Sequence, residues 1–470
     1  MKRREFFRNG SIAAVGATIL NPFSALANIA APYAKADKGK AKNVIFMVSD
    51  GMSTGTLNMA DMYLNRKYGK SSNWMNLYRQ NRAQRALMDT ASASSLVTDS
   101  AASSSAWGGG FRVNNGALNV GPNGEAHKPI LQKFKAAGKA VGCVTTVPIT
   151  HATPAGFCVS VSSRDDQSKI AELYLPLKFD VMMGGGNDYF SAAKRKDGRD
   201  MYQQFSSDGY TIIKNRSEMM SLTAGKPVLG VFADDGLPYT LDRNHDTDLQ
   251  NSVPTLAEMT KTAIALMNTN KTGFALQVEG GKVDWAAHGN DIGGLIYDQA
   301  AFDEAIGVVI DFAEKDGNTL VIITTDHGNS NPGLFYNDLA NKDFDNIQNF
   351  KHTNEWLLAR LRKDDTASRV IEQMEAVQNI VITTSEANAL LKYFNTVEEG
   401  GLYNGANLPL RKLADIQQKY TSVGWGAMEH SADYVELTMF GAGSSQLRPF
   451  MKNTELHNFM LHTTGVQGAV

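Results

Sequence analysis

The sequence predicts an α/β fold, with a central, mostly parallel sheet that is flanked by helices on both faces. Short apolar runs recur along the chain and alternate with stretches whose apolar positions fall at three- and four-residue steps. The runs are almost continuously apolar, which is typical of strands buried on both faces. Several of them end directly at acidic residues or histidines, and sheets of this class bind ligands at the carboxyl ends of their strands.

The expected strands are short, and the first of them ends at the turn pair Asp50-Gly51. They are residues 43–49, 140–147, 179–183, 228–232, 274–278 and 319–324, with a last strand at 434–440. The clearest helices are residues 256–267 and 298–313. This alternation of strands and helices is what places a parallel sheet between two helical layers.

The composition limits both the architecture and the partners. With 470 residues, of which 43% are hydrophobic and 20% charged, the chain is long enough to bury one large core. Its formal net charge of -2 argues against a nucleic-acid-binding surface, which would need an excess of basic residues. An anionic substrate would therefore be attracted by local groups and not by the field of the whole protein.

Residues 1–27 are predicted to be an export signal of the twin-arginine type. The pair Arg3-Arg4 lies in a charged segment, an apolar run follows at 11–20, and Ala25-Leu26-Ala27 gives the small-x-small pattern of a cleavage site. The alternative is an uncleaved amphipathic helix. No later stretch approaches the roughly 20 continuous apolar residues of a membrane span. We therefore expect no membrane span after signal removal, and a periplasmic or secreted protein.

The folded domain is expected to span residues 43–470, after a small, polar, lysine-rich linker at 28–42. Within it, residues 331–425 or thereabouts are helical, charged and loop-rich, and they show no strong strand pattern. We interpret this segment as an insertion at the rim of the sheet, after Asp326-His327.

Two cysteines and two C-terminal histidines are expected to take no part in chemistry. Cys143 and Cys158 each lie among apolar neighbours, and a core of this size does not need disulfides. We expect two buried free thiols, although the sequence leaves a bridge open. His457 and His462 are expected to be exposed.

Three of the expected strands lead into residues that bind metals. Asp50 follows the first strand, Glu279 follows 274–278, and Asp326-His327 follow 319–324. A single carboxylate after a strand is often an ordinary turn residue or helix cap. Because the ends of parallel strands meet at one edge, three such positions accompanied by histidines indicate a shared site.

Two further patterns fit that site. Asp284 and His288 are four residues apart, so on a helical turn both face the same side, which suits one divalent metal. Alone, this spacing is weak evidence. Ser100 lies where a strand-like run meets small, helix-compatible residues, and the amides at a helix N-terminus favour an anion. The alternative is a capping serine without chemistry.

Together these segments resemble the alkaline phosphatase family, from about residue 43 to residue 441. The motifs that carry the resemblance stand in the family's order: VIFMVSDGM, VTDSAAS, THATPAGF followed by Arg164, VEGGKVDWAAH, TTDHG and MEH. The resemblance implies hydrolysis of phosphate monoesters to an alcohol and inorganic phosphate. It also implies a phosphoserine intermediate at Ser100.

The resemblance further implies two Zn²⁺ ions and one Mg²⁺ ion per chain. Their implied ligands are Asp284, His288 and His430 for one zinc, Asp50, Asp326, His327 and Ser100 for the second zinc, and Asp50, Thr153 and Glu279 for magnesium. Arg164 would bind two oxygens of the phosphate at once, as a guanidinium can.

Two positions depart from the enterobacterial members of the family and resemble marine and cold-adapted bacterial members instead. His151 stands where the enterobacterial enzyme has aspartate, and Trp285 where it has lysine. The lost lysine charge would weaken the binding of product phosphate, or Trp285 would only pack against the insertion. His151 would contact phosphate through a water or stay a neutral group behind the ligands. In relatives, such insertions cover the site or build a dimer interface, so the sequence leaves a homodimer open.

Two other functions compete with this one. The first is a phosphodiesterase or related hydrolase on the same scaffold, but such relatives usually have a threonine nucleophile and lack the third metal site. The second is a catalytically silent protein that captures phosphate or metal. It would be expected to have lost Ser100, Arg164 or a ligand, and all of these are present. We expect small-molecule phosphate monoesters as substrates.

Overall fold

The computed structural model describes residues 39–362, 364–394 and 403–466. The predicted export signal and residues 28–38 of the predicted linker lie outside these described residues. Among the described residues, no helix combines the length and the hydropathy that crossing a membrane requires.

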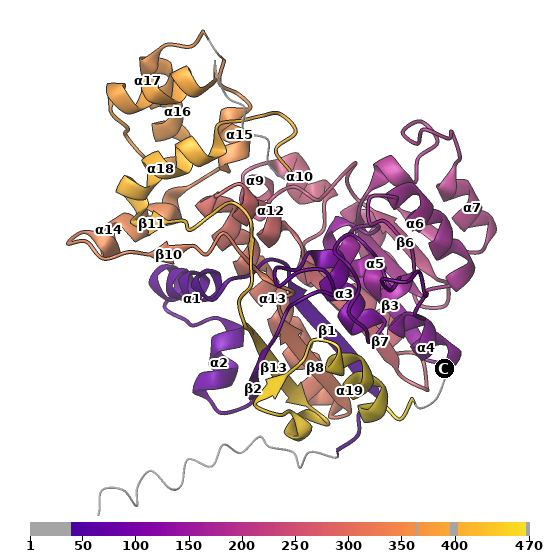
Figure 1. The fold of residues 1–470 in the computed structure, drawn as a ribbon. Coiled ribbons are helices and arrows are strands. Elements are labelled where there is room, and N and C mark those ends of the chain that lie inside the picture. The colour runs from indigo at the N-terminus through magenta and orange to yellow at the C-terminus, as the bar shows by residue number, and fades with distance from the viewer. Residues whose placement is uncertain (1–38, 363, 395–402, 467–470) are drawn as a thin grey trace, which may run out of the picture. The chain divides into compact units, whose positions relative to one another are not determined.

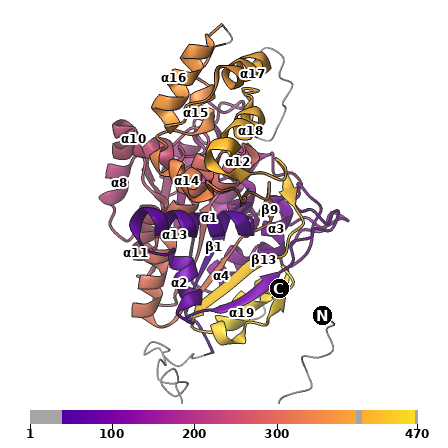
Figure 2. The same ribbon diagram turned by 90° about the vertical axis from the view of Figure 1, so that its left-hand side faces the viewer.

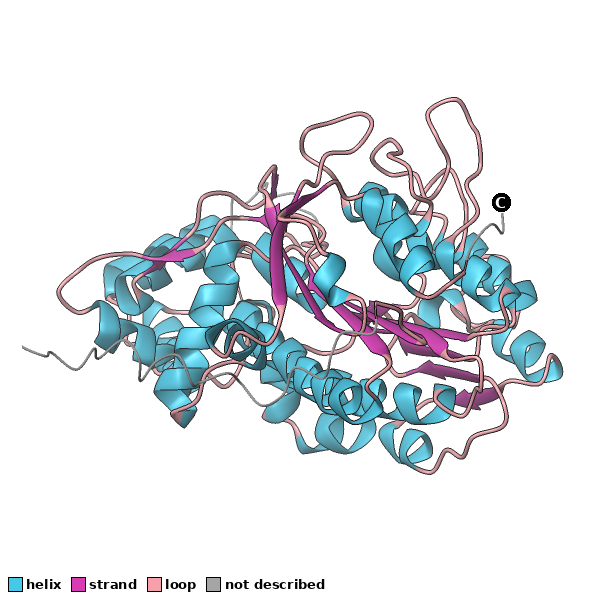
Figure 3. Cartoon of the chain, turned by 90° about the horizontal axis from the view of Figure 1, so that it is seen from below, coloured by secondary structure: helices cyan, strands magenta, loops and turns pink. Residues whose placement is uncertain are grey.

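A ten-stranded sheet runs through the molecule in the order β14-β2-β13-β8-β1-β7-β3-β4-β6-β5 (Figures 1 and 3). Its strands are β1 Asn43–Ser49, β2 Gln84–Met88, β3 Ala140–Pro148, β4 Val181–Gly185, β5 Thr211–Ile213, β6 Val228–Val231, β7 Phe274–Gly280, β8 Thr319–Thr324, β13 Val435–Gly441 and β14 Phe450–Met451. The seven strands from β8 to β5 are parallel, and β13 is antiparallel to both β8 and β2. The predicted α/β fold with a mostly parallel sheet is confirmed.

Helices cover both faces of the sheet (Figure 3). They are α1 Thr54–Tyr68, α2 Asn73–Arg79, α3 Ser100–Gly108, α4 Ile130–Ala136, α5 Ala152–Cys158, α6 Gln167–Tyr174, α7 Met201–Ser207, α8 Arg216–Met220, α9 Thr240–Asn244, α10 Thr247–Ser252, α11 Leu256–Met267, α12 Lys282–His288, α13 Ile292–Asp316, α14 Ala340–Asp345, α15 Asn354–Leu358, α16 Ala367–Gln378, α17 Thr384–Phe394, α18 Leu410–Thr421 and α19 Glu455–Thr463.

The central strand β1 separates two hydrophobic cores because its side chains alternate between the faces of the sheet. Ile45 and Met47 belong to one core, which includes residues of α1, α11 and α13. Phe46 and its neighbours Val44 and Val48 belong to the other, which includes residues of α3, α4, α5 and α19. Every residue of β1 is buried, and this accounts for its unbroken apolar sequence.

Several element boundaries differ from the expectation. The strand expected at 179–183 is shifted by two residues, to Val181–Gly185, and the Asp180 carboxylate just before it accepts a hydrogen bond from the Val141 amide. The helix expected at 298–313 is longer, since Asp291 caps it about two turns earlier. Strand β2 was not expected, because its partly exposed sequence lacks a continuous apolar run.

The segment after Asp326-His327 is helical, as expected, and contains α14 to α18 (Figure 2). A small antiparallel pair joins its two ends: β10 (Gly333–Leu334) pairs with β11 (Val423–Gly424). Whether the segment is an insertion relative to other proteins stays a prediction.

Of the cysteines and C-terminal histidines without a predicted function, all but one have the exposure that we expected. Cys143 and Cys158 are buried free thiols, as expected, with their Sγ atoms 3.6 Å apart. His462 is exposed, but the expectation for His457 was wrong: its side chain is buried and its Nδ1 lies 3.0 Å from the Trp107 carbonyl. Packing of α19 against α3 buries it.

Candidate active site

The site lies at the edge of the sheet where β1, β7 and β8 end. Register places Val48 of β1 beside Glu279 of β7 on one side and Thr324 of β8 on the other. Asp50 lies two residues beyond Val48, and Asp326 lies two residues beyond Thr324. Both therefore lie close to Glu279. Asp50, Glu279 and Asp326 are spread over more than 200 positions of the sequence. Their buried carboxylates nevertheless lie at one edge of the sheet, as predicted.

Helix α3 begins at Ser100, whose side chain is 1% exposed. Asp99 is the N-cap, and its carboxylate accepts a hydrogen bond from the Ala102 amide at 2.9 Å. Ser100 Oγ lies 3.3 Å from His327 Nε2. The helix thus points its N-terminal amides, and this hydroxyl, into the cluster of carboxylates and imidazoles.

The serines that follow Ser100 on α3 have a structural role. Ser103 donates to the Asp326 carbonyl at 2.9 Å, and Ser104 donates to the Thr153 carbonyl at 2.7 Å. A Cβ on Gly156 would come within 2.0 Å of Ser104 Oγ. Only small side chains permit α3 and α5 to approach so closely, and their hydroxyls satisfy the carbonyls buried between them.

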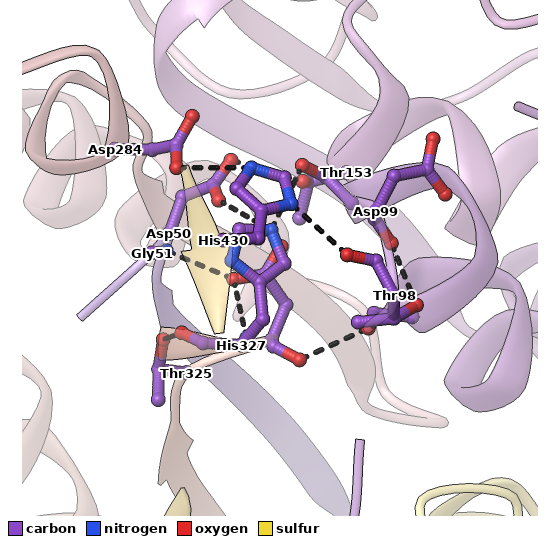
Figure 4. Close-up of polar contacts among 12 residues, drawn as sticks. Asp50, Gly51, Thr98, Asp99, Thr153, Asp284, Thr325, His327 and His430 are labelled. Atoms are coloured by element: carbon purple, nitrogen blue, oxygen red, sulfur yellow. Dashed lines mark hydrogen bonds and ion pairs between the residues drawn. The ribbon is translucent and has the colours of Figure 1, made fainter. Parts of the chain in front are cut away.

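One group of ligand atoms surrounds His327 (Figure 4). His327 Nε2 lies 3.2 Å from Asp326 Oδ2 and 3.6 Å from Asp50 Oδ1. All three side chains are buried, and each offers one atom within 4.8 Å of the others. With Ser100 Oγ beside His327, this is the arrangement predicted for the second zinc.

A second group lies on α12 and on the short strand β12 (His430–Ser431), which pairs with β9 (Gly328–Asn329). Asp284 and His288 face the same side of α12, with Oδ2 and Nε2 3.5 Å apart. His430 Nε2 lies 3.0 Å from His288 Nε2 and 3.6 Å from Asp284 Oδ1. The three residues predicted to hold the first zinc therefore converge.

Hydrogen bonds to backbone carbonyls fix how these histidines are protonated. Their Nδ1 atoms lie near Met428 O (His288, 2.7 Å), Thr98 O (His430, 2.9 Å) and Gly328 O (His327, 3.2 Å). A carbonyl only accepts, so Nδ1 carries a proton in each ring, and Nε2 is the nitrogen that faces the cluster. Nε2 is thereby the nitrogen that each ring would offer to a metal ion.

A third group joins Asp50, Glu279 and His151, whose ligand atoms also lie within 4.8 Å of one another. Thr153 Oγ1 is 3.4 Å from Asp50 Oδ2, and Thr145 donates a hydrogen bond to Glu279. The predicted magnesium ligands are thus adjacent, and Asp50 belongs to two groups. A ring nitrogen of His151 also lies beside these carboxylates, and the sequence left the role of this residue undecided.

The protein alone does not neutralise this site. Burial, with repulsion from Asp326, raises the pKa of Glu279 to about 7. Burial and the neighbouring carboxylates raise the pKa of Asp50 well above its ordinary value. One oxygen on each carboxylate accepts no hydrogen bond: Asp50 Oδ1, Glu279 Oε1, Asp284 Oδ2 and Asp326 Oδ2. Four such buried orphan oxygens beside three imidazole Nε2 atoms fit the binding of cations.

Arg164 and His151 lie beside these groups. Arg164 Nη1 is 3.1 Å from Asp99 Oδ2, and its Nη2 is 3.0 Å from His151 Nε2. Burial, reinforced by the charge of Arg164, lowers the pKa of His151 to about 3, so its ring is neutral. The guanidinium is therefore held between the N-cap of α3 and a neutral acceptor.

Trp285 is stacked on a residue that the sequence analysis missed. Its ring lies 4.5 Å from that of Tyr403, with 22° between the planes. Tyr403 belongs to the segment interpreted as an insertion, and no motif marks it, because its position depends on how that segment folds. Asp99 was also given no role, although its place directly before Ser100 at a helix start is a signal for a cap. All residues predicted from the sequence lie in this one region, and their roles stay predictions.

Known proteins resemble the chain over nearly its whole length. A family model described as alkaline phosphatase matches residues 41–466. Alkaline phosphatase 4 of Bacillus subtilis is 31% identical over 432 residues, which cover 91% of this chain and 89% of that protein. The structure of Thermus thermophilus alkaline phosphatase has a TM-score of 0.84 at 31% identity, and the match covers 91% of this chain and 92% of that one. The cold-active alkaline phosphatase of a psychrophilic Shewanella gives 0.76 at 26% identity, over 90% and 99% of the two chains.

Proposed function

The chain belongs to the alkaline phosphatase family of phosphate monoester hydrolases, and we propose that it works through a phosphoserine at Ser100, beside two Zn²⁺ and one Mg²⁺. The observation that carries this proposal is the position of Ser100 Oγ, 3.3 Å from His327 Nε2 at the start of α3. The hydroxyl is buried at a helix N-terminus, and the nitrogen that it faces is also surrounded by the carboxylates of Asp50 and Asp326, a set of groups that suits a cation.

The residues fit the proposed ions by type. Zinc takes nitrogen and carboxylate oxygen ligands, and magnesium takes oxygen ligands. One zinc would be held by Asp284, His288 and His430, the second by Asp50, Asp326 and His327, and magnesium by Asp50, Thr153 and Glu279. When bound, these ions would neutralise the phosphate and lower the pKa of the serine hydroxyl and of water.

The protein's own groups would then carry out two displacements. In the first, Ser100 Oγ forms a bond to phosphorus, the bond from phosphorus to the alcohol oxygen breaks, and the alcohol leaves with a proton. In the second, a water oxygen bonds to phosphorus and the bond to Oγ breaks, which returns the serine hydroxyl and releases inorganic phosphate. Arg164 would hold two phosphate oxygens throughout, and the first amides of α3 would face the charge that develops.

A phosphodiesterase on the same scaffold is the second candidate. It is less well supported, because the serine nucleophile, Arg164 and the third group around Asp50 suit a monoester dianion. Hydrolysis of p-nitrophenyl phosphate and bis-p-nitrophenyl phosphate at alkaline pH separates the two. We expect fast monoester turnover that is lost with Ser100→Ala or after chelation, and that returns in the chelated wild type with zinc and magnesium. Dominant diester turnover would reassign the substrate class, and bound zinc without turnover of either would favour a binding protein.

The cellular location and assembly form part of the proposal. We propose export to the periplasm or medium through the twin-arginine signal of residues 1–27, with small-molecule phosphate monoesters as substrates. Cell fractionation of the wild type and of an Arg3→Lys, Arg4→Lys variant tests the route, and retention of only the variant in the cytoplasm supports it. Light scattering during gel filtration distinguishes a monomer from a homodimer.

A further inference from the structure

Tyr403 brings the helical segment of residues 331–425 into contact with the proposed phosphate site. Its hydroxyl lies 3.0 Å from His151 Nε2, and its ring centroid is 5.6 Å from that of His288. The stack on Trp285 fixes the plane of the phenol ring. Tyr403 lies outside every recognised motif. It nevertheless contacts His151, the hydrogen-bond partner of Arg164, and lies beside His288, a predicted zinc ligand.

His151 has two hydrogen-bond donors and one atom to receive them. Arg164 Nη2 lies 3.0 Å from His151 Nε2, the same nitrogen that Tyr403 contacts. A guanidinium only donates, so Nε2 accepts and the ring proton is on Nδ1, which has no partner of its own. The single lone pair on Nε2 accepts one strong hydrogen bond, and therefore Arg164 and Tyr403 compete for it.

We propose that Tyr403 is a positioning residue that frees Arg164 for phosphate by taking over its hydrogen bond to His151. This inference rests on the proposed function, because it requires a phosphate at Arg164. A phosphate oxygen is a stronger acceptor for the guanidinium than a neutral imidazole. When Arg164 turns to phosphate, the Tyr403 hydroxyl donates fully to Nε2, and the buried nitrogen is not left unsatisfied.

The hydroxyl of Tyr403 is important as a second hydrogen-bond donor because His151 is buried away from water. Its side chain is 5% exposed, so water does not readily replace a lost donor. Leaving a buried acceptor without a partner is unfavourable, and without Tyr403 that penalty would be subtracted from phosphate affinity. The other contact of Arg164, to Asp99, does not change this, since it uses the other nitrogen of the guanidinium.

The test is Tyr403→Phe, which removes the hydroxyl and keeps the ring that stacks on Trp285. In zinc- and magnesium-loaded protein we expect KM for p-nitrophenyl phosphate and the inhibition constant of inorganic phosphate to rise about tenfold, with kcat changed much less. Tyr336→Phe is the matched control, because that side chain is 93% exposed and should change neither constant. Phosphate affinity measured by calorimetry gives a second readout that does not depend on turnover.

A double-mutant cycle with His151→Ala shows whether Tyr403 acts through His151. If it does, Tyr403→Phe causes no further loss of phosphate affinity once His151 is alanine. The same fold-loss in both backgrounds, or a Tyr403→Phe protein with wild-type phosphate affinity, overturns the inference. These outcomes differ from failure of the proposed function, in which the wild type itself neither turns over phosphate monoesters nor binds phosphate.

Discussion

Ser100 and His327 are 227 positions apart in the chain, yet Ser100 Oγ lies 3.3 Å from His327 Nε2. The contact joins the start of α3 to the end of β8, and both side chains are buried. His327 Nδ1 faces the Gly328 carbonyl, so the nitrogen facing Ser100 carries a lone pair. This nitrogen also faces Asp50 and Asp326, which places the proposed nucleophile at a group of metal-ligand atoms.

Glu279→Gln should remove the third metal while leaving two zinc ions bound. The substitution keeps the shape of the side chain and the oxygen that accepts from Thr145, but it removes the charge from the orphan oxygen Oε1. We expect magnesium to be lost, zinc content to stay near wild type, and kcat to fall about 10- to 100-fold, as for groups that orient a metal site. Metal analysis by mass spectrometry checks this, and loss of zinc in parallel with magnesium would mean that the groups are not separable.

Stability of the metal-free protein should fall as the pH rises. Burial raises the folded-state pKa of Glu279 from 4.5 to about 7 and that of Asp326 from 3.8 to about 6. The folded protein therefore holds more protons than the unfolded chain between these values, and the free energy of unfolding decreases as pH rises through about 4 to 7. The loss should be on the order of 3 kcal/mol for each such carboxylate.

Bound metal should reverse this trend, because metal binding strengthens as ligands lose protons. Urea unfolding of chelated and metal-loaded protein across that pH range provides the comparison. Other buried carboxylates titrate equally in both samples, so the difference between them isolates the site. Identical pH slopes with and without metal would contradict the assignment of these carboxylates as ligands.

Arg164→Lys tests whether two parallel hydrogen bonds to phosphate are needed. Lysine keeps the positive charge but cannot donate from two nitrogens at once. We expect kcat/KM for p-nitrophenyl phosphate to fall about 100-fold, mainly through KM. Arg216→Lys, which alters a partly exposed ion pair with Glu258, serves as the control. Equal kinetics for both variants would show that charge alone suffices.

Trp285→Lys tests the two interpretations of this position. An ammonium near His151, which contacts Arg164, should tighten the binding of product phosphate, lowering its inhibition constant and also kcat if release limits turnover. Trp285→Phe keeps an aromatic ring for Tyr403 and adds no charge. If both variants behave alike, the tryptophan serves only to pack against Tyr403, which the stacked geometry already shows it does.

The sequence predicted those parts of the molecule that depend on local pattern. Strand β1 and helix α11 have the expected limits, because each buries a regular apolar pattern. Strand β2 escaped prediction because its contacts with β13 come from distant residues and leave much of it exposed. The same holds in the site: Asp284 and His288 were evident from spacing, whereas Tyr403 meets His151 only through the packing of a separate segment. Burial of His457 against α3 was missed for that reason too.

The most direct test of the account is to trap the phosphoryl group on the protein. Metal-loaded enzyme is mixed with a phosphate monoester, quenched in acid, digested, and analysed by mass spectrometry for phosphorylation within residues 97–107. We predict one phosphate on Ser100 in the wild type and none in Ser100→Ala, while Ser206→Ala, an exposed serine on α7, labels like the wild type. Rapid turnover without a phosphorylated Ser100, or labelling that persists in Ser100→Ala, would contradict the proposed mechanism.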